Sequence, residues 1–438
     1  MPSRVRWPGG CGLAGRQLWE SDGRTANMTH DLLVKDVAVP EQPLLTQEGC
    51  AMKRSTDRIL ATHTGKLVMP DAGNTFMGPP PTPPGRVEYE VSELVKKQVE
   101  IGMDIISNGE PAGIGPGTMF QLIDGFETID VHIPADEPAV SPERVRWLGR
   151  DFFKYEDFYT NMFATWMGDV DNPVINMRTV VSGPLKLRST APIEQDIQLF
   201  KKVLAAHAPD KEAFYCVIAP EWLEEFVWNE YYKTDDDFVV ALTEAIAPIF
   251  KTVTDNGLIL QIDDPAISHD WEEARRPPMT DEEYERFIMI RMEALNAALE
   301  GVPEDRVRFH TCWGSWPGMH TNEVPLAKLV PTMLKAKAQA FSLESAKSTR
   351  RLEWQIWRDQ FKWPEDKIII PGVVDHTTLV VEPPEVVADT IINFANVCGR
   401  ENVIAGTDCG MRWHAEAAWA KYGNIVKGAE LASKRLWR

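Results

Sequence analysis

From residue 52 onward the chain alternates short apolar runs with long amphipathic segments, and this alternation constrains its fold more than any other feature. Short apolar runs are typical of buried strands, and apolar residues at helical spacing are typical of helices that pack on a sheet. Strands that alternate with helices predict a parallel sheet. The predicted strands are Ile59–His63, Asp104–Ser107, Phe214–Ala219, Leu258–Ile262, Val307–Cys312, Ala340–Leu343, Ile368–Val374 and Val403–Ala405.

The segments between these strands supply the helices, among them Asp235–Asp255, Leu326–Lys337 and Glu385–Val397. Eight strand–helix units predict an α/β fold of one catalytic domain over residues 52–438, a closed (β/α)8 TIM barrel with insertions. One insertion, between the second and third strands, is expected to hold a strand at Arg178–Ser182 and a hairpin at Thr128–Ile133. An open doubly wound sheet is the alternative, but the chain lacks the glycine-rich motifs of nucleotide-binding sheets.

Residues 1–51 differ from the rest of the chain. They contain arginines at positions 4, 6, 16 and 24 and little apolar periodicity, and they lack the apolar core of a secretory signal. We interpret them as a disordered extension, or as sequence upstream of the natural start. Met52 directly precedes the first predicted strand and would make a natural beginning.

The charge and the cysteine content limit the partners and the compartment. Lys and Arg number 46 against 65 Asp and Glu, a net charge of −19, which repels nucleic-acid backbones and anionic membranes. No apolar run is long enough to span a bilayer. Six cysteines are too few for a disulfide scaffold in a chain of this length, so we expect a cytoplasmic protein with free thiols. The sequence does not indicate an oligomeric state.

Polar side chains follow almost every predicted strand. In a barrel the carboxyl ends of the strands carry the functional residues, so these positions are the candidate site. They are His63 to Lys66, Asn108 to Glu110, Asp263 to Pro265, His310 to Trp313, Ser342 to Ser345, Asp375 with His376, and Thr407 to Gly410.

Four of these residues suit a metal ion. His310 and Cys312 are two apart in a strand, so both side chains face the barrel mouth, and Glu344 and Cys409 end two further strands on the same rim. Two thiolates, one imidazole and one carboxylate suit Zn2+, with the carboxylate as the ligand that can yield its place. The alternative for His310 and Cys312 alone is a packed pair without a metal. Cys216 and Cys398 lie within apolar patterns and are interpreted as core thiols.

Several motifs together resemble the catalytic domain of cobalamin-independent methionine synthase. The matching blocks, in order, are Asn108-Gly-Glu110-Pro, Gln261-Ile-Asp263-Asp-Pro-Ala266, His310-Thr-Cys312, Phe341-Ser-Leu-Glu344-Ser, Pro371-Gly-Val-Val-Asp375 and Thr407-Asp-Cys409-Gly, spread over residues 55–415. The resemblance implies a zinc-dependent barrel that alkylates a substrate thiol at sulfur. It implies zinc ligation by His310, Cys312, Glu344 and Cys409, and contacts from Glu110 and Asp263 to the amino group of homocysteine.

The chain also departs from that family. It has one barrel where the full-length enzymes have two, which leaves the methyl donor open. The first strand is followed by Thr64-Gly65-Lys66, and the seventh loop reads Asp375-His376-Thr377, one residue out of the family's register. These variants are similar to shorter single-barrel relatives, including epoxyalkane:coenzyme M transferase, which uses a thiolate to open an epoxide.

Three further residues are candidates with open alternatives. His63 could line the substrate pocket or be a structural histidine, and Lys66 could bind a carboxylate or sulfonate of the thiol or be a solvated loop residue. His376 could transfer a proton near the leaving group, or it could orient its loop.

The sequence therefore predicts a zinc-dependent S-alkyltransferase that activates a small-molecule thiol and takes an alkyl group from a donor. Methyl transfer to homocysteine or a similar thiol is the leading hypothesis. The alternatives are thiolate opening of an epoxide and a zinc- or thiol-binding protein without turnover.

Deletion of residues 1–51 should change the free energy of unfolding by less than about 1 kcal/mol, the range of surface changes, because this segment has little apolar periodicity to bury. Urea denaturation of the full and shortened chains measures the difference. A shortened protein that is insoluble would contradict the interpretation of these residues.

Overall fold

The computed structural model describes residues 51–70, 86–111, 115–131, 149–159, 161, 177–269, 271, 278–315, 318–411 and 414–438. Residues 1–50 lie outside the described residues, so the interpretation of the extension stays a prediction. No helix in the described part of the chain is both long enough and apolar enough to cross a membrane.

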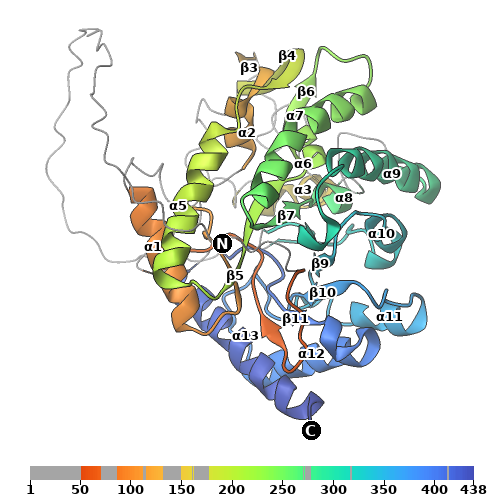
Figure 1. Cartoon of the computed structure of the whole chain (residues 1–438). Helices are drawn as coiled ribbons and strands as arrows, with labels where there is room; N and C mark the ends of the chain where they lie inside the picture. Colours follow the sequence, from red (N-terminus) through yellow and green to blue (C-terminus); the bar gives the residue numbers. More distant parts are fainter. Residues whose placement is uncertain are drawn as a thin grey trace, which may run out of the picture. The chain divides into compact units, whose positions relative to one another are not determined.

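Eight parallel strands in the described part form the predicted barrel (Figure 1). They are β1 (Leu60–Ala61), β2 (Ile105–Ser107), β5 (Glu212–Ile218), β7 (Ile259–Asp263), β8 (Val307–Thr311), β9 (Ala340–Leu343), β10 (Ile368–Pro371) and β11 (Ile404–Ala405). Six of them form one sheet in the order β2, β5, β7, β8, β9, β10, and β11 pairs with β1. Parallel bridges join β10 to β11, and the Asp104 N–H donates to the Ala61 carbonyl at 3.0 Å, which links β1 to β2. The (β/α)8 prediction is confirmed.

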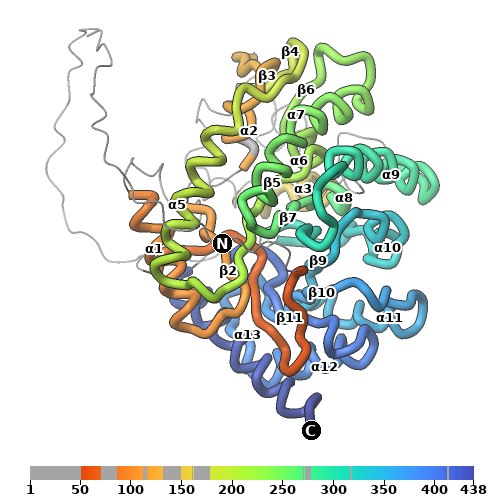
Figure 2. The backbone as a smooth tube through the Cα atoms, viewed as in Figure 1, coloured from red at the N-terminus to blue at the C-terminus, as the bar shows by residue number. Residues whose placement is uncertain are grey.

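Helices surround this ring, and the backbone trace in Figure 2 follows the same order of strand and helix along the chain. Neighbouring helices pack in sequence order, α1 on α5, α5 on α7, α7 on α9 and α9 on α10, and later α11 on α12 and α12 on α13. The helices are α1 (Arg86–Glu100), α2 (Pro116–Leu122), α3 (Arg150–Lys154), α5 (Ala191–His207), α6 (Pro220–Glu224), α7 (Asp235–Asp255), α8 (Ala266–His269), α9 (Asp281–Ala298), α10 (Leu326–Met333), α11 (Ile356–Asp359), α12 (Pro384–Cys398) and α13 (Ala415–Leu436).

Local sequence explains where the two central helices begin. The Thr234 hydroxyl accepts from the Asp237 N–H at 3.0 Å at the start of α7. At the start of α9, Thr280 and Glu283 form a reciprocal capping box. Both first turns carry three acidic residues, which favour the positive end of the helix dipole.

A second sheet lies outside the barrel, in the insertion between β2 and β5 and after α6. It pairs β4 (Met177–Leu187) with β3 (Ile123–Asp130) on one side and β6 (Val227–Asn229) on the other. The predicted strand Arg178–Ser182 lies within β4. Residues 128–130 of the predicted hairpin instead end β3, whose partner is distant in sequence, and residues 132–133 lie outside the described residues.

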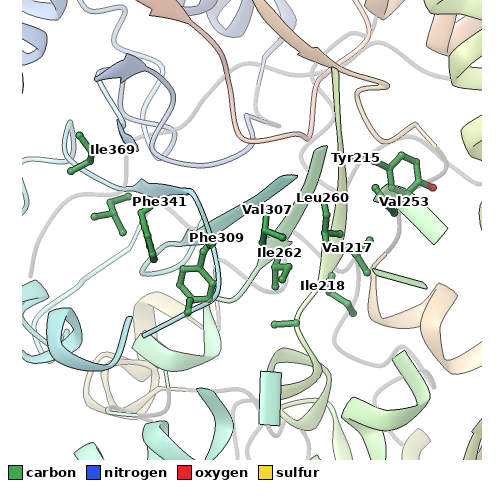
Figure 3. Close-up of a cluster of buried hydrophobic side chains, with 14 of the residues drawn as sticks. Tyr215, Val217, Ile218, Val253, Leu260, Ile262, Val307, Phe309, Phe341 and Ile369 are labelled. Carbon is green, nitrogen blue, oxygen red and sulfur yellow. The ribbon is translucent and has the colours of Figure 1, made fainter. Parts of the chain in front are cut away.

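The core has two apolar layers, because alternate residues of each strand face the helices or the barrel axis. The outer layer includes Val217, Leu260, Phe309 and Phe341 (Figure 3). The inner layer fills the amino end of the barrel with residues from seven strands, Leu60, Ile105, Phe214, Ile259, Ala340, Ile368, Ile370 and Ile404, together with Met52 and Cys216.

Arg308 separates this inner layer from the polar end of the barrel. It is 1% exposed, its guanidinium lies 4.0 Å from the ring of Phe214, and it donates to the Thr62 hydroxyl at 3.2 Å and to the His63 carbonyl at 2.9 Å. Burial lowers its pKa to about 10, so it remains charged at neutral pH.

Substitution of Phe309 by alanine should lower the free energy of unfolding by about 3–5 kcal/mol, because Phe309 is fully buried between the barrel and its helices. Val240→Ala, at a residue that is 46% exposed on α7, should change it by less than about 0.5 kcal/mol. Urea denaturation of both variants measures this contrast, and similar losses in both would contradict the assignment of the outer layer.

Candidate functional site

The candidate site lies at the carboxyl ends of β7, β8 and β9, where register aligns the polar residues. Asp263 on β7 pairs with His310 on β8, and His310 pairs with Ser342 on β9. Because side chains alternate along a strand, Arg308, His310 and Cys312 all face the barrel axis. Strand register therefore brings together residues that are far apart in the sequence.

His310, Cys312 and Cys409 form one group of possible metal-ligand atoms at this end, all within 4.8 Å of one another, and Asp375, His376 and Asp408 form another within the same limit. His310 and Cys312 are buried, and Cys409 is partly buried. Cys312 donates a hydrogen bond that lowers the pKa of Cys409 well below that of an ordinary thiol, and the adjacent His310 adds to the effect. The same contact, together with burial, raises the pKa of Cys312.

The geometry of His310 fits metal ligation. Its Nδ1 lies 3.3 Å from the carbonyl oxygen and 3.2 Å from the hydroxyl of Ser342. An Nδ1–H bond to that carbonyl leaves Nε2 as the acceptor nitrogen, the arrangement that histidine ligands use. Nε2 is buried and has no hydrogen-bond partner among the described residues. Two sulfurs and an imidazole nitrogen thus converge, a donor set that fits Zn2+.

Glu344 lies beside this group but outside it. Its carboxylate is fully buried, and Oε1 accepts from the Trp313 N–H at 2.9 Å. Oε2 has no hydrogen-bond partner in the described part of the chain and lies 3.8 Å from the Lys347 ammonium. The structure therefore places the predicted fourth ligand next to the three others, with its carboxylate held by neighbouring protein groups.

A second group lies on the other side of His310. Ligand atoms of Glu110, Cys216 and Asp263 are within 4.8 Å of one another. Burial raises the pKa of Asp263 to about 8, with Glu110 and Cys409 adding to the rise and His310 opposing it. These electrostatic interactions connect Asp263 to both groups, so the predicted amino anchor lies close to the predicted metal ligands.

The backbone at Glu110 is strained. Glu110 has a φ of 52°, a left-handed conformation that is uncommon for residues other than glycine, and its N–H donates to the Asn108 side chain at 3.1 Å. The Lys66 ammonium donates to the Glu110 carbonyl. Gly65, with a φ of 118°, lies beneath its carboxylate, where an added Cβ would be 2.2 Å from Oε1. Lys66 therefore holds the Glu110 backbone, and the absence of a side chain at Gly65 leaves room for the Glu110 carboxylate.

The two predicted histidines outside the metal group differ in their surroundings. His63 is fully buried, with Nε2 2.8 Å from the Gln98 side chain and Nδ1 accepting from the Gly65 N–H at 3.1 Å. Burial lowers its pKa to about 3, so this geometry favours the structural alternative. His376 is buried 3.9 Å from Glu344, and burial lowers its pKa also.

Asp408 connects two loops of the site. Its carboxylate accepts from the backbone N–H groups of Ser345, Ala346 and Lys347 at 2.7, 2.9 and 2.8 Å. It therefore ties the loop after Glu344 to the strand end that carries Cys409. Sequence analysis missed this role, although Asp408 lies inside the Thr-Asp-Cys-Gly block. It also missed Arg308, Lys347 and the position of Cys216 beside Glu110, for which no local pattern gives a signal.

Known proteins are similar to the chain in both sequence and fold. Residues 234–431 match the family described as "Cobalamin-independent synthase, Catalytic domain". A methionine synthase of Thermococcus kodakarensis is 28% identical over 227 residues, 51% of this chain and 58% of that protein. A methionine synthase of Sulfurisphaera tokodaii is 25% identical over 222 residues, 50% of this chain and 56% of that protein. The chain thus matches little more than half the length of these relatives.

The fold comparison extends further along the chain. A solved B12-independent methionine synthase from Shewanella sp. W3-18-1, in complex with selenomethionine, superposes with a TM-score of 0.63 at 17% identity and covers 87% of this chain and 99% of that one. The sequence match contains Asp263 and all four predicted metal ligands, whereas Glu110 lies outside it. Residues 234–431 are therefore similar to the catalytic domain of the cobalamin-independent synthases, within a barrel whose fold is that of B12-independent methionine synthase.

Proposed function

We propose that the chain is a zinc-dependent S-alkyltransferase that transfers a methyl group to homocysteine or a similar thiol. The convergence of the ligand atoms of His310, Cys312 and Cys409 is the observation that carries the proposal. The similarity of this region to cobalamin-independent synthases supports it. A Zn2+ ion held there would lower the pKa of a coordinating thiol, so that the thiol could react as a thiolate at neutral pH.

The protein groups around this position have separate roles. His310, Cys312 and Cys409 would hold the ion, and Glu344 would be the ligand that yields to the substrate sulfur. Ser342 orients the imidazole of His310. His376, buried near Glu344, would give or accept a proton. The inner apolar layer and Arg308 fill the barrel next to this position.

Glu110 and Asp263 would bind the other end of the thiol. Two partly buried carboxylates that lie close together favour a cation between them, because each raises the free energy of the other's charged form. The ammonium group of homocysteine supplies such a cation. The Lys66 ammonium already donates one hydrogen bond to the Glu110 carbonyl. It would bind the substrate carboxylate through its remaining N–H groups.

Thiolate opening of an epoxide is the second candidate, through the similarity of this chain's loops to single-barrel relatives such as epoxyalkane:coenzyme M transferase. The two reactions share the metal ligands and differ in thiol and donor. Thiol loss in a panel of homocysteine, coenzyme M and glutathione, crossed with methyl donors and small epoxides, separates them. Zinc and thiol binding without turnover in every combination would favour the non-catalytic alternative.

Purified protein should contain close to one zinc per chain, and Cys312→Ser or Cys409→Ser should lose most of it, because each removes one of three converging ligands. Elemental analysis measures the zinc, and circular dichroism checks that the barrel persists. Cys398→Ser is the matched control, since Cys398 ends α12 outside the group and should keep its zinc. Full zinc in both Cys312→Ser and Cys409→Ser would contradict the metal assignment.

Glu110→Gln should raise the Michaelis constant for homocysteine about tenfold or more, the loss of one charge-assisted contact, and should leave that for coenzyme M nearly unchanged. Glutamate and glutamine experience the same backbone strain at position 110, so the substitution changes only the charge of the side chain. Glu100→Gln, at the exposed end of α1, is the control. Steady-state kinetics with both thiols measure the effect. An equal change in the Michaelis constants for homocysteine and coenzyme M would mean that Glu110 does not bind an amino group.

A further inference from the structure

The surroundings of Glu344 hold a cation that can serve as a partner for its carboxylate in place of a metal. Oε1 is bound by the Trp313 N–H, and Oε2 lies 3.8 Å from the Lys347 ammonium. Both side chains are buried, Glu344 completely and Lys347 at 5% exposure. A buried carboxylate that leaves a metal needs a cation nearby, because an uncompensated buried charge is costly.

Lys347 is fixed in this position by other charges. Its ammonium bonds Glu323 Oε1 at 2.9 Å, and Arg350 bonds Glu323 Oε2 at 2.7 Å. His320 lies 2.7 Å from Glu323 Oε1. Although burial opposes the effect, these neighbours lower the pKa of Glu323 to about 2, so Glu323 remains a carboxylate. Lys347 therefore lies between two buried carboxylates, bonded to Glu323 and facing Glu344.

The same network positions the other contact of Glu344. The guanidinium of Arg350 lies 3.8 Å from the ring of Trp313, and the Trp313 indole N–H donates to the Val324 carbonyl at 2.8 Å. Trp313 follows Cys312 directly in the chain. Its backbone N–H is thus held next to the metal-ligand group by packing on the cations that surround Glu323.

We propose that Lys347 is a positioning residue that stabilises the Glu344 carboxylate when it is off the metal, and so sets how readily Glu344 gives its place to a thiol. The inference rests on the proposed function, because it requires a metal at His310, Cys312 and Cys409. The carboxylate of Glu344 would then have two alternative partners. One would be the metal, and the other is the pair formed by the Trp313 N–H and Lys347.

Two variants of the full chain should change zinc affinity in opposite directions. Lys347→Met should bind zinc about tenfold more tightly, the scale of one contact to a charged group, because Glu344 loses its alternative partner. Glu323→Gln should bind zinc more weakly, because it releases Lys347 toward Glu344. Lys347→Arg, which keeps the cation, should restore the wild-type affinity. Competition with a chromophoric chelator measures the zinc affinity of all three variants. A change of zinc affinity in the same direction in Lys347→Met and Glu323→Gln would contradict the inference and indicate damage to the site.

A double variant separates this role from a general effect of charge. In a Glu344→Gln background, Lys347→Met should leave zinc affinity unchanged, because Lys347 acts through Glu344. An equal gain in both backgrounds would overturn the inference, since any cation near the metal would then act alike.

Zinc K-edge spectroscopy gives a readout independent of affinity. Addition of homocysteine should replace an oxygen ligand by sulfur in the wild type, and Lys347→Met should require a higher thiol concentration for the same change. A wild-type chain without zinc would overturn the proposed function and this inference together. Zinc binding and thiol exchange that Lys347→Met leaves unaltered would overturn the inference alone.

Discussion

The parallel register of β7, β8 and β9 is the constraint on which the candidate site depends. It aligns Asp263, His310 and Ser342 across three adjacent strands, so backbone hydrogen bonds set the positions of the proposed amino anchor, of the proposed metal ligand and of the residue that contacts that imidazole. A slip of one residue in β8 would turn His310 and Cys312 toward the helices. The apolar outer layer, with Phe309 between Arg308 and His310, makes that slip costly.

Much of this arrangement could be predicted because it follows from periodicity. The strand Ala340–Leu343 and the helix Asp235–Asp255 have the predicted bounds, and His310 and Cys312 face one way because strands have a period of two. Periodicity alone could not predict every contact of the candidate site. Whether Glu344 lies within the metal group depends on contacts with Trp313 and Lys347, which tertiary packing decides. Cys216 follows the apolar pattern of a core residue and is one, yet its sulfur also lies beside Glu110.

Charge in this protein is arranged in layers along the barrel. Arg308 lies next to the inner apolar layer, Glu110 and Asp263 lie near the proposed metal-ligand group, and the cations Lys347 and Arg350 both bind Glu323. The net charge of −19 thus says little about the site, where carboxylates and buried cations lie side by side. Asp408 joins two of these elements through three amide contacts, so the positions of Cys409 and Lys347 are linked through the backbone.

The side chains that fill the interior of the barrel would affect the order in which two substrates bind. Arg308, stacked on Phe214 above the inner apolar layer, closes the amino end of the axis, so the described barrel opens toward the metal-ligand group from one side. In the proposed reaction, the thiol and the alkyl donor would both approach from that end. The thiol whose sulfur reaches His310 and Cys312 would lie deeper, and the alkyl donor above it would block its escape. Such a geometry would favour an ordered sequence in which the thiol arrives first and the alkylated product leaves last.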